Sequence, residues 1–238
     1  MKNRGMIIVV IFAIVGHSII NYKYLSFRYE DYSSAFFLLG IPGETEYTLF
    51  IFWYFVFVSI SFYFSGEVSE LLSGYGKYVI IRNYHKGKWI SRRYLLALLR
   101  LTIFPLILML VAFIVSVLSS EEMENYYLTT EIIISFVIYC LVYCNLIFLQ
   151  LYLEMFITPQ IALLIVNIYV IVSVLLGGLI IKFEKGMFLM PILIPNISMS
   201  LRRDYIYLTD SISICYLLLI GLTIFFLSYR KFTTKDIL

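Results

Sequence analysis

Six long apolar runs, separated by polar or charged connections, form the pattern of this 238-residue chain. They cover residues 6–20, 48–65, 101–118, 132–153, 161–181 and 212–228. The run 132–153 has no charged residue and would be about 33 Å long as a helix, enough to cross roughly 30 Å of hydrocarbon. The pattern predicts an all-α polytopic membrane protein with six transmembrane helices, forming a single domain over residues 1–238.

Composition excludes several other classes of protein. Hydrophobic residues make up 62% of the chain and charged residues 14%, against about 25% charged in a soluble domain, and a membrane β-barrel would need alternating segments of about ten residues. The net charge of +3 is too small to indicate a nucleic-acid partner. Lys2 and Arg4 precede the first run as in a signal peptide, but Ala13 and Gly16 form a poor cleavage pattern, so we interpret this run as an uncleaved helix.

The distribution of basic residues predicts the orientation, because connections rich in Lys and Arg resist translocation. Eleven basic residues lie in the terminal segments and the second connection, whereas six lie in the connections of the opposite side. Both termini are therefore assigned to the cytoplasm. The connection 182–210 carries four basic residues on the predicted outer side, so a re-entrant arrangement of this region stays open.

Residues that an enzyme would need are scarce. The chain has two histidines, His17 and His85, no HExxH and no phosphate-binding GxxxxGK[ST] motif, so we predict no catalytic site, metal or cofactor. Glu121 and Glu122 resemble the paired glutamates of CAAX-type intramembrane proteases, but Tyr126 stands where an arginine is expected. Several polar residues within the spans have two interpretations, hydrogen bonding between helices or lining a substrate path: Ser59, Ser61, Asn145, Gln150 and Asn167.

The second connection, residues 65–93, is the most informative stretch. Residues 67–72 can extend the second span as a helix, and Gly74 and Gly76 then permit a sharp turn. An apolar group at residues 78–81 is followed by basic residues and Trp89. This amphipathic element fits either an interfacial segment on anionic lipid or a docking element for a cytoplasmic partner.

The sequence GYGKYVIIRNYHKGKW at residues 74–89, following the glutamate-bearing end of the second span, resembles the coupling region of type 2 ABC exporter membrane subunits, particularly small permeases of peptide-antibiotic export or immunity systems. The resemblance implies a short amphipathic coupling element between helices 2 and 3 that docks on a separate cytoplasmic ABC ATPase. It also implies a second permease subunit, as a homodimer or heterodimer. The residues that it places at the ATPase are Glu67, Glu70, Tyr75, Lys77, Tyr78, Arg82 and Trp89.

Two further segments bear on this resemblance. In the family, short half-helices between helices 5 and 6 dip into the membrane from outside, and Pro191 and Pro195 prevent one regular helix at that position here. Family members also usually begin with an interfacial amphipathic helix, for which the five residues before Met6 leave no room.

These features predict a permease subunit of an ABC exporter in the bacterial plasma membrane. It would move a hydrophobic or amphipathic peptide, for export of an antimicrobial peptide or for self-immunity, and would have no nucleic-acid partner. The alternative is a membrane immunity or assembly protein that binds a peptide without transporting it. An intramembrane enzyme is disfavoured by the missing ligands.

Overall fold

A computed structural model describes residues 4–25, 36–42, 46–72, 86–119, 129–206 and 208–234. The backbone within these ranges is largely helical and contains no strand. The elements are α1 (Arg4–Leu25), α2 (Phe36–Leu39), α3 (Tyr47–Phe64), α4 (Glu67–Leu72), α6 (Lys86–Ser119), α7 (Thr130–Leu153), α8 (Pro159–Phe183), the 3-10 helix η2 (Met187–Ile192), α9 (Ile194–Ile197), α10 (Ser200–Arg203) and α11 (Asp210–Thr234).

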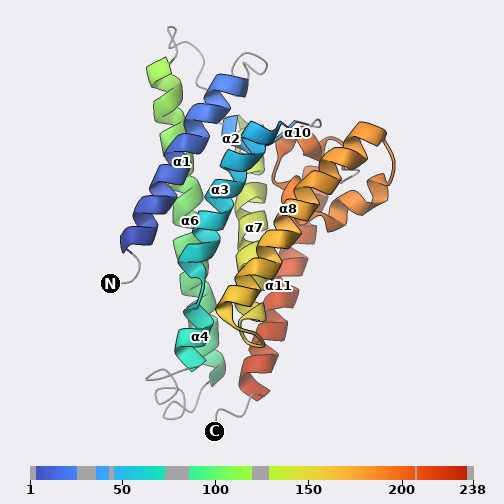
Figure 1. Cartoon of the computed structure of the whole chain (residues 1–238). Helices are drawn as coiled ribbons and strands as arrows, with labels where there is room; N and C mark the ends of the chain where they lie inside the picture. The colour runs from blue at the N-terminus through green and yellow to red at the C-terminus, as the bar shows by residue number, and fades with distance from the viewer. Residues whose placement is uncertain are drawn as a thin grey trace.

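All six predicted spans are confirmed, and the chain is a multi-pass membrane protein. The described residues contain six helices long and apolar enough to cross a bilayer: Gly5–Leu25, Tyr47–Ser69, Ile90–Ser119, Thr130–Leu153, Pro159–Phe183 and Asp210–Thr233. They run alternately up and down, so that α4, the α7–α8 connection and the C-terminal end of α11 lie together at the bottom of Figure 1. We name this the inner end, after the side that the basic residues favour, and the opposite end the outer end.

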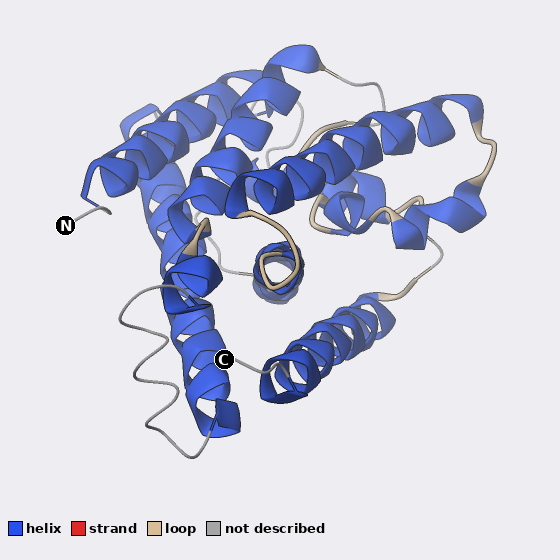
Figure 2. Cartoon of the chain, turned by 60° about the horizontal axis from the view of Figure 1, so that its bottom comes forward, coloured by secondary structure: helices blue, strands red, loops and turns tan. Residues whose placement is uncertain are grey.

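Helix α7 forms the centre of the bundle. It packs against α3, α6, α8, α9 and α11, and Figure 2 shows it end-on among the surrounding helices. In the most apolar 18-residue stretch of α7, 61% of the residues are buried, whereas in that of α11 only 17% are buried. A buried central helix therefore organises the fold, and the outer faces of its neighbours are left for lipid.

The prediction for the start of the third span was wrong by fifteen residues, because α6 begins at Lys86 rather than at residue 101. The apolar run stops at Arg100, but Lys and Arg favour helices as much as most apolar residues do. Their long side chains also reach water from a helix that has left the hydrocarbon. Lys88, Arg92 and Arg93 thus lie on a helix continuous with the span, rather than on a separate connection.

The outer connection between α8 and α11 is broken into the short helices η2, α9 and α10, which confirms the expectation from its two prolines. Pro191 lies inside η2 and Pro195 in the first turn of α9, where a missing N–H group costs least. In Figure 1 these elements form a hairpin beside the outer end of α8.

A buried arginine holds this hairpin to the bundle. The Arg202 side chain has no exposed surface. Its Nε donates to the carbonyl of Ile41 at 3.0 Å, and its Nη1 donates to the carbonyl of Val174 and to Oδ1 of Asn196, both at 2.7 Å. Burial lowers the pKa of Arg202 to about 10, which leaves the guanidinium protonated at neutral pH. One cation therefore ties three segments of the outer end together.

Close packing at Gly177 depends on the same cluster. A β-carbon at this position would lie 2.4 Å from Oδ1 of Asn196, the atom that accepts from Arg202. Only glycine lets α8 approach α9 this closely, as small residues do elsewhere in membrane bundles.

Candidate functional site

The second span ends in a break at the inner end. Helix α3 stops at Phe64, and Gly66 adopts a left-handed conformation with φ of +86°, which glycine reaches without the steric cost of a β-carbon. Helix α4 then begins at Glu67 and leads directly into residues 73–85. We call the break and the first turn of α4, residues 65–68, the α3–α4 joint.

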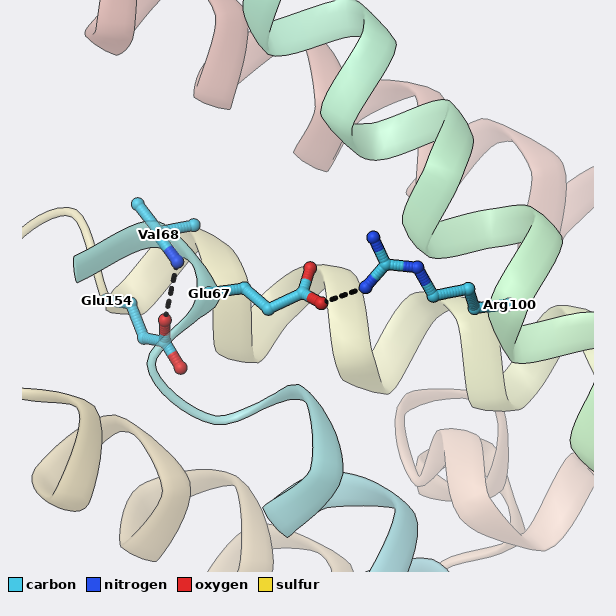
Figure 3. A network of polar contacts seen from close by, with 4 residues as sticks. All are labelled: Glu67, Val68, Arg100 and Glu154. Carbon is cyan, nitrogen blue, oxygen red and sulfur yellow. Dashed lines mark hydrogen bonds and ion pairs between the residues drawn. The ribbon is translucent and has the colours of Figure 1, made fainter. Parts of the chain in front are cut away.

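A carboxylate from a distant part of the chain caps this joint. Oε1 of Glu154 accepts from the N–H of Gly66 at 2.9 Å, and Oε2 accepts from the N–H of Val68 at 3.2 Å; Figure 3 draws the second of these bonds. The first N–H groups of a helix have no partner within the helix, so an acceptor there also meets the positive end of the helix dipole. Glu154 follows the last residue of α7 and is 3% exposed, which makes it a buried cap from the central helix.

An ion pair holds α4 on its other side. Nη1 of Arg100, on α6, donates to Oε1 of Glu67, and Figure 3 shows the pair beside the Glu154 contact. Its side chains are 34% and 22% exposed, so the pair is partly screened by solvent. Helix α4 is therefore attached to α7 by Glu154 and to α6 by Glu67.

Hydrogen bonds continue from the joint into the bundle. Nε2 of Gln150 donates to the carbonyl of Ser61 at 3.1 Å, and the Ser61 hydroxyl donates to Oε1 of Gln150. On α8, Nδ2 of Asn167 lies 3.5 Å from the Ser61 hydroxyl oxygen, and Oδ1 of Asn167 accepts from the Tyr54 hydroxyl at 3.1 Å. These bonds link α3, α7 and α8 in one polar network, and Nε2 of Gln150, which lies 3.5 Å from Oε1 of Glu154, connects it to the joint.

This network confirms the prediction of hydrogen bonding between helices for most of the polar residues within the spans. Asn145 also conforms, because its Nδ2 donates to the carbonyl of Leu217 on α11 at 3.0 Å. Ser59 differs, since its hydroxyl donates to Phe55 in its own helix. His17 is buried, and its Nε2 lies 2.9 Å from Nδ2 of Asn21 on the same helix, so it serves the structure of α1.

Most residues of the predicted ATPase-docking set lie outside the described residues. These are Tyr75, Lys77, Tyr78 and Arg82, as are Glu121 and Glu122 of the rejected protease pattern. Glu70 belongs to α4 and Trp89 to α6, but only their backbones are described. Glu67 is the member whose side chain is placed, in the α3–α4 joint. Sequence reasoning missed its partner Arg100 and the cap Glu154; the available signal was that each is a lone charge at the end of a long apolar run.

A pH dependence follows from the buried cap. Burial raises the pKa of Glu154 above its ordinary value of 4.5, and the nearby Glu67 carboxylate adds to the increase, against opposing hydrogen bonds from Gly66, Val68 and Gln150. Since the folded pKa exceeds the unfolded one, this group favours the folded state more at low pH, and that contribution is lost as the pH rises through the folded pKa. We therefore expect that lowering the pH from 7 to 5 raises the free energy of unfolding, measured with denaturant, more in the unaltered protein than in Glu154→Gln. An equal change in the two proteins would contradict this role of Glu154.

Comparison with known proteins places the chain in a family. It is 27% identical over 224 residues to the uncharacterized protein YybK of Bacillus subtilis (strain 168), an alignment that covers 88% of this chain and 89% of the relative. No solved structure matches the chain. The model of the family described as a protein of unknown function (DUF2705) matches residues 6–238. The chain, with its six-helix bundle and capped α3–α4 joint, therefore belongs to the DUF2705 family.

Proposed function

We propose that this chain is the membrane permease subunit of an ABC exporter in the bacterial plasma membrane, moving a hydrophobic or amphipathic peptide with a separate ATPase subunit. The observation that carries the proposal is the double attachment of α4. This short helix leads directly into residues 73–85 at the inner end, and it contacts both the central helix α7 through Glu154 and α6 through Arg100.

In the proposed mechanism the α3–α4 joint transmits movement. Closure of an ATPase dimer on bound ATP displaces residues 73–85, and α4 moves with them. Because Glu154 lies at the end of the buried polar network, a shift of α4 acts on the packing of α3, α7 and α8. Exchange between two packings of these helices then exposes the peptide path to one side of the membrane and afterwards to the other.

Two further features support this proposal. The sequence has no phosphate-binding loop, so the ATPase of the proposed exporter is a second chain. The short helices η2, α9 and α10 lie between the fifth and sixth spans, the position at which the resembled permeases carry half-helices. Irregular backbone within a membrane is tolerated where protein surrounds it. Helix α9 meets this condition, because it is buried against α7 and α8.

The first test is recovery of the ATPase. The chain is expressed with its co-encoded proteins and purified in mild detergent, and the bound ATPase is quantified. The double substitution Tyr78→Asp and Arg82→Glu replaces an aromatic side chain and a cation of the docking element by carboxylates, so ATPase recovery should fall at least about tenfold, as for loss of an interface anchor. Movement of peptide into inverted vesicles, with and without ATP, separates transport from mere binding.

The matched control changes an aromatic residue and a basic residue at the other end of the bundle. Tyr24 and Lys23 are exposed at the outer end of α1, and Tyr24→Asp with Lys23→Glu should leave ATPase recovery unchanged. Absence of any ATPase with the unaltered chain, or equal recovery in both double variants, would refute the proposal.

A further inference from the structure

A cavity of about 670 Å³ opens at the outer end, between the α10–α11 segment and the start of α7. This volume falls within the range of small-molecule and peptide-side-chain pockets. Its lining is rich in polar groups: Glu131, Ser135, Ser200, Arg203, Asp204, Thr209 and Asp210. The lining therefore contains three carboxylates and one guanidinium, so its net charge is negative.

Two buried polar groups of the lining lack partners among the described residues. Arg203 is 9% exposed; its Nη2 donates to the Ser135 hydroxyl at 2.6 Å and its Nε lies 3.2 Å from Oδ1 of Asp210, but its Nη1 has no partner. The hydroxyl of Ser200, 8% exposed, is also without one. Buried donors are nearly always paired. Both atoms are covered by protein, so an oxygen acceptor in the cavity pairs with them when the two side chains rotate toward it.

The carboxylates favour a ligand with positive charge. Glu131 and Asp204 are exposed at the cavity, and neither forms an ion pair within the described residues. Exposed carboxylates of this kind pair with ammonium and guanidinium groups of a ligand. An anionic ligand would instead meet net repulsion.

Charge over the whole outer end points in the same direction. Eleven of the fifteen acidic residues, but only six of the eighteen basic residues, lie in the three outer connections. Acidic residues contribute little to membrane topology, so orientation does not account for this excess. A negative outer surface does attract cations and speeds their arrival.

We propose that the outer cavity binds a cationic peptide segment, whose backbone carbonyl oxygens accept from Arg203 and Ser200 and whose basic groups pair with Glu131 and Asp204. The choice of a peptide rests on the proposed function, whereas the positive charge and the carbonyl contacts come from the cavity itself. Binding to this site needs no ATP and no ATPase.

The test measures binding to the purified full chain in lipid nanodiscs, without ATPase or nucleotide. The probes are two fluorescent octapeptides of alternating leucine with lysine or with glutamate. The lysine peptide should bind more tightly, and binding should weaken with rising salt. The variant Glu131→Gln with Asp204→Asn should weaken it about fivefold, because it removes two solvent-exposed ion pairs, each of which contributes modestly. Ser200→Ala should weaken both peptides, because it removes a donor to the backbone.

The matched control is Glu184→Gln, which removes one acidic charge at the same end from an exposed residue that does not line the cavity. It should leave the affinity unchanged. Equal binding of the two peptides, or equal affinity in the cavity variant and the control, would mean that the cavity holds water alone and would overturn the inference. Failure of ATPase recovery would refute the exporter proposal without altering these binding results.

Discussion

Replacement of Arg202 by methionine is expected to lower the free energy of unfolding by about 2–4 kcal/mol. Methionine fills a similar volume but offers no donor, so the carbonyl of Ile41 and Oδ1 of Asn196 lose their guanidinium contacts inside the protein. A buried acceptor without a partner costs about 1–3 kcal/mol; removal of the desolvated charge offsets part of this. The change in the free energy of unfolding is measured for both proteins in the same detergent, with the loss of the helical circular dichroism signal as the readout.

Two further variants make this result specific. Lys182→Met removes an exposed cation at the same end, and should change the stability by less than about 0.5 kcal/mol, as surface substitutions do. Arg202→Lys retains the charge but lacks the planar fork that reaches three segments at once, so its loss should be intermediate. Stability of Arg202→Met equal to that of Lys182→Met would show that the guanidinium does not anchor the outer hairpin.

The six spans were predictable from the sequence because the bilayer imposes a length and an apolar composition on each spanning helix. The run 132–153, for example, matches α7, Thr130–Leu153, to within two residues. The helix ends were less predictable. Helix α6 extends to Lys86 because helix formation continues through charged residues once the chain leaves the hydrocarbon, and hydropathy alone does not register this continuation.

The polar contacts of the candidate site were beyond sequence reasoning because they join residues far apart in the chain. Glu154 caps a joint that lies 88 residues before it, and Arg202 donates to a carbonyl 161 residues away. From the sequence, Arg202 counted only as one basic residue of an outer connection, and no role was assigned to Glu154. Their burial follows from the packing of α7, α8 and α9, which single-helix patterns do not specify.

The helix predicted at residues 67–72 of the second connection was only partly correct. Residues 67–72 are helical, as predicted, but they form the separate helix α4, because the left-handed Gly66 breaks them from α3. The prediction of a helix was possible because residues 67–72 contain no Gly or Pro. What holds this helix in place was missed, because the positions of its partners on α6 and α7 depend on the tertiary fold.

Under the proposed exporter function, substitution of Glu154 by leucine is expected to reduce ATP-dependent peptide movement at least about tenfold while the ATPase still co-purifies. Leucine removes both hydrogen bonds to the start of α4, and hydrogen bonds to charged groups contribute about 1.5–3 kcal/mol each. Loss of 1.4 kcal/mol of coupling corresponds to about a factor of ten. Residues 73–85 are unchanged in this variant, so docking should persist even though α4 no longer moves α7.

Glu154→Gln provides the matched comparison, because the amide oxygen retains one acceptor for the N–H groups of Gly66 and Val68 and keeps the length of the side chain. It should recover much of the transport that leucine loses. The helical circular dichroism signal and the unfolding midpoint of both variants are measured alongside, since a bundle that has unfolded would lose ATPase binding as well as transport. Transport at the unaltered rate in Glu154→Leu would exclude the α3–α4 joint as the element that links the ATPase to the central helix. Transport lost equally in the two variants would assign the role to the negative charge rather than to the cap.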